Sequence, residues 1–509
     1  MTDFPLKLRT VALAAAMASV AMCWSAPDNK LVIMHTNDTH SQVEPDDKGL
    51  GGIARRKTLI DSVRAAEPNT LLVDAGDMVQ GTLFYYLYKG DVENRLADML
   101  GYDMRILGNH EFDNGAEDWA RRMKDTKSTW LSTNYDLREA EMGKKFVPYT
   151  IREVGGRKIG FIGLNLDPDG IIAPGNYNGV KYLDLYKAAN ATAWYLKNIE
   201  HCDMVVALTH IGYEPTETGT SDLELAAKSE DIDIIIGGHS HTVVGPVPGG
   251  KPWRIPNAKG DTILVTQTGR RGQNLGLVTI DLDNLGTDYK LIPVDKRLDN
   301  VKQVEIDDYL AVPRQGVDSL MHVWVGNTAM RFEQEGEPIL NLLSDFVEHR
   351  GEQIAGDDVD FAILNKGGIR QSLPKGRISE GEVINMVPFS NYIVVLEISG
   401  KDLADNFDIM AKTAGNGVSE DAEVTYDPKT KKAVSVLIDG KPLDPDKTYR
   451  VATIDYLANG GDYMKPLKNG KVIARSPNYL YADFLNWIRK EMKGKKLKAD
   501  DTKRMRPVE

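Results

Sequence analysis

Short apolar runs separated by longer amphipathic stretches make up the first half of the chain. Six runs that end in polar residues are predicted as strands, at 31–34, 71–73, 104–107, 158–164, 204–208 and 232–236. Apolar residues recur every three or four positions between several of these runs, which predicts helices over 53–66, 84–100 and 186–200. Strands that alternate with helices are typical of a layered α/β domain.

A charged stretch interrupts this pattern after residue 300. We interpret it as a linker with some helix, and predict four further strands beyond it, at 323–325, 361–365, 393–398 and 449–453. The fold class is therefore α/β in two domains. The predicted order is a leader over 1–26, a first domain over 27–300, a linker or hinge over 301–320 and a second, substrate-binding domain over 321–509.

Composition restricts the function classes. With 42% hydrophobic and 27% charged residues, the chain resembles neither a disordered nor a polytopic membrane protein. Its 62 basic and 74 acidic residues give a net charge of −12, which argues against a nucleic acid polymer as partner. A phosphate site in such a protein needs local positive charge from a metal ion or from arginines. Only Cys23 and Cys202 are present, so no disulfide framework is expected.

The first residues have the layout of a secretory signal. Lys7 and Arg9 precede an apolar run over 11–22 that is too short to span a bilayer. We therefore expect export to the periplasm or the extracellular space, with no transmembrane span. The stretch 20–23 is an imperfect lipoprotein box, which leaves a lipid anchor on Cys23 as the alternative to soluble export.

Polar clusters that follow the predicted strands carry the residue types that bind divalent metals. They are Asp38 and His40 in HTNDTH, Asp77 in DAGDMVQGT, Asn109 and His110 in GNHEFD, His210 in ALTHIGY, and His239 and His241 in GGHSHT. Carboxylate, imidazole and amide groups are ligands for such metals, and a metal pair needs one carboxylate that bridges it. Because ligands gather at the carboxyl ends of strands in α/β folds, we expect these side chains to meet at one edge.

The five segments, in this order and followed by NKGGIR and ANGGD, resemble the 5'-nucleotidase family of the calcineurin-like metallophosphoesterases. The resemblance covers nearly the whole chain after the leader. It implies two divalent metal ions, with Zn, Mn or Co expected. One metal would be held by Asp38, His40 and His241, the other by Asn109, His210 and His239, and Asp77 would bridge them. Several relatives carry Gln or Asn at the position of His241, which here offers a stronger nitrogen donor.

His110 and Asp113 are predicted as a catalytic pair. Their spacing lets the carboxylate orient the imidazole, and a histidine held in this way stays cationic more readily. Beside a phosphate it can stabilise the oxygens or protonate the leaving oxygen, and the resemblance assigns the pair such a role. No side-chain nucleophile is required, because water activated by two metals can attack phosphorus.

The second domain is expected to recognise the nucleoside. The segment 365–370 places glycines beside a fixed cation, which suits an anionic or hydroxyl-rich ligand. By resemblance, Asn365, Gly368 and Arg370 contact the nucleotide, Phe389 and Tyr456 stack on the base, and Asp462 contacts the ribose or base. Stacking between two rings tolerates different bases, so broad base specificity is expected.

One departure from the family pattern concerns the phosphate chain. Relatives usually carry a phosphate-binding arginine where Glu335 and its neighbours occupy this sequence. An acidic residue on the path of a second or third phosphate would oppose its charge, which predicts a preference for monophosphates.

These observations predict an exported enzyme that uses two metals to hydrolyse nucleoside 5'-monophosphates to nucleoside and phosphate. Within the family, the alternatives are a UDP-sugar hydrolase, a 2',3'-cyclic-nucleotide phosphodiesterase and a thiosulfate-ester hydrolase. From another class, the chain could be a non-catalytic surface protein that binds nucleotides, although the intact Asp77, Asn109 and His110 argue against it.

Overall fold

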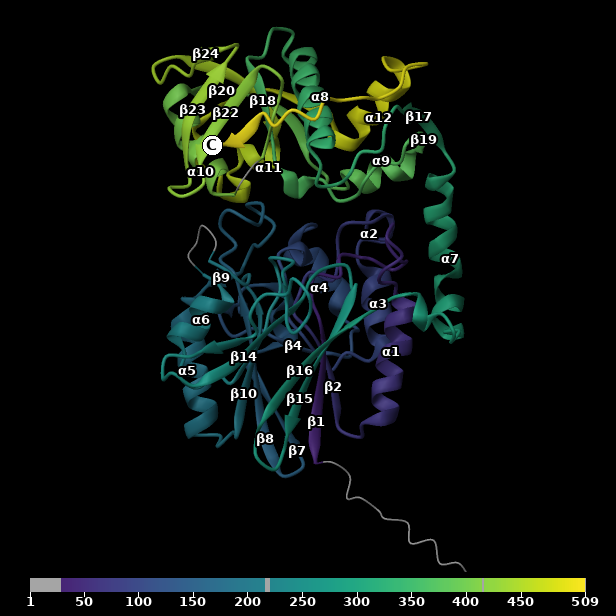
Figure 1. Ribbon diagram of the computed structural model, residues 1–509, viewed down its shortest axis with the longest axis vertical. Helices are drawn as coiled ribbons and strands as arrows, with labels where there is room; N and C mark the ends of the chain where they lie inside the picture. Colours follow the sequence, from purple (N-terminus) through teal and green to yellow (C-terminus); the bar gives the residue numbers. More distant parts are fainter. Residues whose placement is uncertain (1–28, 216–219, 414–415, 509) are drawn as a thin grey trace, which may run out of the picture.

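The structure is a computed structural model that describes residues 29–215, 220–413 and 416–508. The predicted leader and its possible anchor at Cys23 lie outside these residues. Two α/β domains stand one above the other, with the N-terminal domain in purple to teal and the C-terminal domain in green to yellow (Figure 1). The α/β fold class predicted from the sequence is confirmed. None of the helices in the described part of the chain is long and apolar enough to cross a bilayer.

Two seven-stranded sheets pack face to face in the N-terminal domain. The first has the order β16-β15-β1-β2-β3-β4-β6, formed by β1 (Lys30–Thr36), β2 (Thr70–Asp74), β3 (Met104–Arg105), β4 (Thr129–Leu131), β6 (Phe146–Val147), β15 (Asn274–Asp281) and β16 (Thr287–Pro293). The second has the order β12-β14-β11-β10-β8-β7, formed by β7 (Tyr149–Val154), β8 (Arg157–Asn165), β10 (Met204–His210), β11 (Ile234–Ile236), β12 (Val243–Val244) and β14 (Thr262–Thr268), with β13 (Arg254–Pro256) paired to β14.

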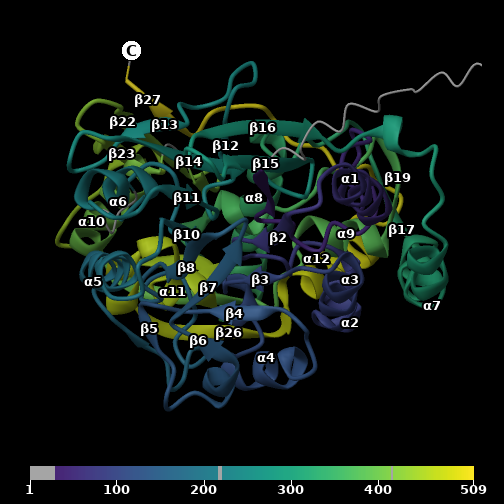
Figure 2. The same ribbon diagram turned by 90° about the horizontal axis from the view of Figure 1, so that it is seen from below.

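Helices cover the outer faces of both sheets (Figures 1 and 2). α1 (Ile53–Ala66) and α3 (Asp91–Leu100) pack on the first sheet, and α5 (Leu185–Asn198) and α6 (Asp222–Lys228) pack on the second. β1 is buried on both sides, because Leu31 and Ile33 face the core between the sheets while Val32 and Met34 face the helices. This explains why the strand appears in the sequence as a continuous apolar run.

The predicted helices match the structure with one exception. α1 has the predicted bounds 53–66, but the stretch 84–100 forms two helices, α2 (Leu83–Tyr88) and α3. The break lies at Lys89 and Gly90, whose φ angles of 54° and 100° are left-handed and cannot continue a right-handed helix. The apolar spacing runs through this break, so periodicity alone does not show it.

The C-terminal domain contains a five-stranded sheet, a four-stranded sheet and a short ribbon. The five-stranded order is β21-β18-β25-β20-β26, formed by β18 (Phe361–Leu364), β20 (Tyr392–Ser399), β21 (Gly417–Val418), β25 (Thr448–Ile454) and β26 (Lys471–Tyr479). The four-stranded sheet contains β22 (Ala422–Asp427), β23 (Lys432–Ile438), β24 (Lys441–Pro442) and β27 (Met505–Pro507), and the ribbon pairs β17 (Trp324–Thr328) with β19 (Gly376–Ser379). The flanking helices are α8 (Glu337–Ala355), α9 (Glu380–Met386), α10 (Gly400–Lys412) and α12 (Leu480–Lys490).

The chain passes between the domains through α7 (Val304–Met321), which runs along one side of the molecule (Figure 1). The predicted linker is therefore largely helical, with Pro313 inside the helix. Its role as a hinge stays a prediction. A second link is hydrophobic: Leu83 of α2 is 1% exposed and belongs to the core of the C-terminal domain, close to Gly381 of α9.

His35 on β1 is buried between the two sheets of the N-terminal domain. Its ring stacks on Tyr289 at a centroid distance of 5.7 Å, and neither ring nitrogen has a hydrogen-bond partner. Burial lowers the pKa of His35 to about 3. The residue thus has a core position, separate from the metal-ligand candidates.

His35→Leu is expected to make the protein more resistant to acid. Between pH 6.5 and 3 the unfolded chain protonates His35 and the folded chain does not, so stability falls as the pH decreases through this window. The contribution amounts to about 2–3 kcal/mol at pH 4.5. Urea unfolding at pH 7 and pH 4.5 should show a smaller loss for His35→Leu, whereas the same change at the exposed His322 should leave the loss as in the unmodified protein. Equal losses in all three proteins would contradict the assignment.

Candidate active site

The predicted metal ligands lie at the carboxyl ends of five strands, with Asn109 in the loop after β3 and His210 as the last residue of β10. Asp38 and His40 follow β1, Asp77 follows β2, and His239 follows β11. Left-handed backbone conformations are concentrated here, at Asp38, His40, Asp77, His239 and His241, with φ between 47° and 78°. Non-glycine residues adopt this conformation at a cost, and they persist where the surroundings fix them, as at functional sites. The local backbone therefore turns these side chains toward a common point.

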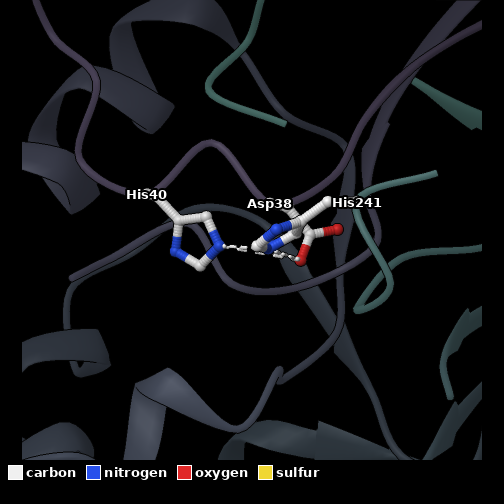
Figure 3. Close-up of side chains that lie close together, drawn as sticks. All are labelled: Asp38, His40 and His241. Carbon is white, nitrogen blue, oxygen red and sulfur yellow. Dashed lines mark hydrogen bonds and ion pairs between the residues drawn. The ribbon is translucent and has the colours of Figure 1, made fainter. Parts of the chain in front are cut away.

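Three groups of side chains lie close enough together to hold a metal ion. They are Asp38, His40 and His241, then Asp77, His210 and His239, and finally His40, Asp77 and His110, with ligand atoms within 4.8 Å of one another in each group. Figure 3 shows the first group, in which Nε2 of His241 lies 2.8 Å from Nε2 of His40 and 3.4 Å from Oδ1 of Asp38. Asn109 joins the second group, with its Oδ1 3.0 Å from Nδ1 of His239. The structure thus brings all seven predicted ligands together.

The surroundings of His210 show whether this set of donor atoms fits a cation. Its Nδ1 donates to the carbonyl oxygen of Ala75 at 2.7 Å, so Nδ1 carries the proton. Nε2 is buried with no hydrogen-bond partner and faces Oδ2 of Asp77 at 3.2 Å. Two lone pairs that face each other in a buried space need a positive charge between them. Without a metal this charge is a proton: burial favours the neutral ring, but Asp77 and Asp38 raise the pKa of His210 to about 10. The donor set fits a metal.

Asp77 lies at the centre of the site. Its Oδ2 is 3.2 Å from Nε2 of His210, 3.9 Å from Nε2 of His110 and 4.0 Å from Nε2 of His40. Its Oδ1 accepts the backbone N–H of His110 at 2.9 Å. Burial opposes its ionisation, but His210 and His110 hold the pKa of Asp77 well below its ordinary value. The carboxylate is therefore charged and within reach of both groups of ligands.

His110 and Asp113 form the expected pair. Nδ1 of His110 lies 3.0 Å from Oδ2 of Asp113. Burial would lower the pKa of His110, but the carboxylates of Asp113 and Asp77 raise it above the ordinary value. The ring also lies against Phe389 of the C-terminal domain, with centroids 5.7 Å apart. This imidazole thus stands between the metal-ligand groups and the second domain, and two carboxylates favour its protonated form.

Glu111 is a site residue that the sequence reasoning did not identify. It is 3% exposed and accepts three backbone N–H groups, from Asp77 at 3.1 Å, Met78 at 3.0 Å and Gly108 at 2.6 Å. These bonds join the loop after β2 to the loop after β3. In the sequence, only its position inside GNHEFD pointed to a role for Glu111. The spacing of residues in this segment does not distinguish a buried carboxylate from an exposed one.

A single cavity of about 430 Å³ joins the two domains. Asp77, His110 and His239 line it from the N-terminal side. From the C-terminal side it is lined by all six predicted substrate contacts, Asn365, Gly368, Arg370, Phe389, Tyr456 and Asp462. This volume is typical of pockets that bind small molecules. Arg370 brings a cation to the cavity wall, with one guanidinium nitrogen 3.0 Å from Nδ1 of His40.

Asp462 links two residues on the C-terminal wall of the cavity. One carboxylate oxygen accepts from the hydroxyl of Tyr456 at 2.8 Å and the other from Nδ2 of Asn365 at 2.7 Å. Oδ1 of Asn365 is buried and has no partner, so it is available to accept a hydrogen bond from a ligand. Asp462 fixes both neighbours and leaves that acceptor available.

Glu335 does not lie where the sequence reasoning placed it. It pairs with Arg270 at 2.5 Å, its side chain is 74% exposed, and it is absent from the cavity wall. The reason is that Arg270 of the N-terminal domain reaches across the interface and draws the carboxylate toward it. Glu335 therefore neutralises a nearby arginine and does not face the phosphate path.

Two segments of the chain match known family models. Residues 31–243 match the family model of the calcineurin-like phosphoesterases, a family that uses divalent metals. Residues 321–469 match the model of the 5'-nucleotidase C-terminal domain.

Similar proteins span most of the chain. A 5'-nucleotidase precursor from Thermus thermophilus has a solved structure with 30% identity and a TM-score of 0.84, over 94% of this chain and 99% of that one. An apyrase from Tabanus yao is 29% identical over 87% of each chain. The trifunctional nucleotide phosphoesterase YfkN from Bacillus subtilis (strain 168) is 28% identical over 85% of this chain, which spans only 32% of YfkN.

Proposed function

This chain belongs to the 5'-nucleotidase family of the calcineurin-like phosphoesterases, and from that premise we propose that it hydrolyses nucleoside 5'-monophosphates to nucleoside and phosphate. The observation that carries the proposal is the single cavity that joins the metal-ligand groups to the predicted nucleotide contacts. A catalytically silent nucleotide-binding protein would not need the two ligand groups or the His110–Asp113 pair beside that cavity.

Two divalent ions fit the donor set. Asp38, His40 and His241 would hold one ion, Asn109, His210 and His239 the other, and Asp77 would contact both. Burial and Arg370 lower the pKa of His40 well below its ordinary value, so this imidazole is neutral, as a metal ligand must be. When bound, such ions supply Lewis acidity that activates water and offsets phosphate charge.

The remaining chemistry comes from side chains. Because Nδ1 of His110 is held by Asp113, its Nε2 is the atom that can donate a proton to the leaving 5'-oxygen. Arg370 supplies a fixed cation for the phosphate. Phe389 and Tyr456 offer faces for the base, and Oδ1 of Asn365 accepts a ribose hydroxyl. Each of these groups acts on a different part of a nucleotide.

A metal series combined with a substrate panel tests the proposal. Chelation should abolish phosphate release from AMP, and Zn, Mn or Co should restore it. AMP, UDP-glucose, 2',3'-cyclic AMP and ATP should be compared by kcat/KM, because these substrates separate the proposed activity from its alternatives within the family. Full activity of a rigorously metal-free sample would refute the metal-dependent mechanism, and binding of AMP without hydrolysis would identify a silent binding protein.

Export forms a separate part of the proposal and rests on the leader over 1–26. Mass spectrometry of the protein from a periplasmic or secreted fraction should show a mature chain that begins near residue 26. A lipid-modified N-terminus at Cys23 would instead support the anchored form, and an intact leader on cytosolic protein would contradict export.

Glu335→Gln is expected to improve the use of ADP relative to AMP. Removing the carboxylate frees Arg270, which lies with Arg271 and Arg370 around a small gap next to His241. A further phosphate then meets an unpaired guanidinium, and we expect about a threefold to tenfold gain in the ADP to AMP ratio of kcat/KM. The same change at the exposed Glu333 serves as control. An unchanged ratio would show that Arg270 does not reach the substrate.

A further inference from the structure

Gln80 occupies an unusual position beside the predicted catalytic pair. It lies three residues after Asp77 in the loop between β2 and α2, and it is only 3% exposed. Its backbone is left-handed, with φ of 73°, which costs a residue with a side chain about 1 kcal/mol or more. The protein retains this unfavourable conformation at a buried glutamine, which indicates that the side chain has a specific role.

The orientation of its amide is fixed by the backbone. Oε1 of Gln80 accepts the N–H of Gly81 at 2.9 Å, and because this N–H can only donate, Nε2 must lie on the other side. Nε2 donates to Oδ2 of Asp113 at 2.7 Å. The same carboxylate oxygen accepts from Nδ1 of His110. Gln80 thus holds the oxygen that orients the imidazole.

We infer that Gln80 is a positioning residue, which fixes the Asp113 carboxylate so that His110 keeps its proton on Nδ1 bound to Asp113 and presents Nε2 to the cavity. The geometric part stands on the hydrogen bonds alone. Its consequence for catalysis rests on the proposed function.

Gln80→Leu tests the kinetic consequence. We expect kcat for AMP to fall about tenfold, with KM within threefold of normal and metal content unchanged. In an Asp113→Ala background the same substitution should cost less than twofold, because there is no carboxylate left to position. Gln273→Leu removes another Gln–Asp hydrogen bond, to Asp46, and serves as matched control. A full loss in the Asp113→Ala background, or a loss of metal, would overturn the inference.

A measurement without substrate or metal separates this inference from the proposed function. In metal-free protein labelled with ¹⁵N-histidine, the hydrogen-bonded Nδ1 proton of His110 should be visible by NMR and should broaden or disappear in Gln80→Leu. An identical signal in both proteins would overturn the positioning role, whether or not the enzyme hydrolyses AMP.

A second, independent observation concerns a small cavity below the loop that carries His40. Its volume of about 20 Å³ suffices for one water molecule. Glu93 of α3, Arg56 of α1 and Gln42 line it, each less than 10% exposed. The Ser41 hydroxyl faces Glu93 from the same cavity wall, and both carboxylate oxygens of Glu93, Oε1 of Gln42 and Nε of Arg56 make no hydrogen bond of normal geometry within the protein. Unsatisfied buried groups of this kind are costly, so a cluster of them around one cavity points to a bound molecule.

We propose that this cavity holds one ordered water molecule, which donates to Glu93 and Gln42 and accepts from Arg56. The mixture of acceptors with a cationic donor suits water and opposes a metal ion. A high-resolution crystal structure of the full chain should show the water within about 3 Å of at least two of these groups. Glu93→Leu should remove it. In the unmodified protein, either a dry cavity or density with the short contacts of a metal ion would be sufficient to overturn the proposal.

Discussion

Replacing Asp77 by alanine is expected to abolish phosphate release from AMP and to remove both metal ions. The side chain is 2% exposed, and its Oδ2 lies within 4.0 Å of nitrogens from both ligand groups, on His210 and His40. Loss of one shared carboxylate weakens two positions at once, and we expect kcat to fall by more than about 10⁴-fold. Elemental analysis together with single-turnover kinetics measures both effects.

The control for this experiment is a carboxylate outside the site. Asp136→Ala removes a partly buried acid that pairs with the exposed Arg138 away from the cavity, and it should keep full metal content and activity. Circular dichroism should confirm that Asp77→Ala is folded, because Asp77 also accepts the backbone N–H of His110. Two metal ions retained in folded Asp77→Ala would exclude a shared ligand.

His110→Asn is expected to lower kcat by roughly 10² to 10⁴-fold with little change in KM or in metal content. The imidazole is a proton donor that lines the cavity beside the metal-ligand groups, and asparagine keeps a polar group of similar size but cannot release a proton. Asp113→Asn should have a smaller effect, because the imidazole then loses its orientation and part of its charge while remaining present.

The structure also suggests which experimental result would contradict the role of His110 as proton donor. His110 belongs to the third possible ligand group, with His40 and Asp77. If His110→Asn lost metal and activity in equal proportion, His110 would be a ligand and the proton donor would have to be sought elsewhere in the cavity.

Sequence reasoning was strongest where chemistry and strand ends coincide. Asp38 and Asp77 follow apolar runs that form neighbouring parallel strands, which bring both positions to one edge of the first sheet. His210 ends a parallel strand of the second sheet, which packs against the first. That rule does not depend on loop conformation. The positions of Gln80 and Glu111, in contrast, depend entirely on loop conformation. Their hydrogen bonds are made to backbone groups that only the folded loops bring near.

Contacts between the two domains could not be predicted from the sequence, for a different reason. Arg370 was predicted as a nucleotide contact, but its approach to His40 depends on how the two domains pack against each other. The same holds for Glu335, which the sequence placed near the phosphates and the structure pairs with Arg270. Local pattern carries no information about which surface of one domain meets which surface of the other.

The burial of Leu83 in the core of the opposite domain bears on how often the active-site cavity opens. Any arrangement that separates the domains exposes this side chain to water, at about 1.5–3 kcal/mol for a fully buried leucine. That difference favours the closed population by about 10- to 150-fold. Leu83 begins the helix that follows the loop of Asp77 and Gln80, so the catalytic loop and this hydrophobic contact move as one piece of chain. A separation of the two domains would therefore have to hydrate this leucine, in addition to breaking ion pairs such as Arg270–Glu335 and Arg331–Asp47.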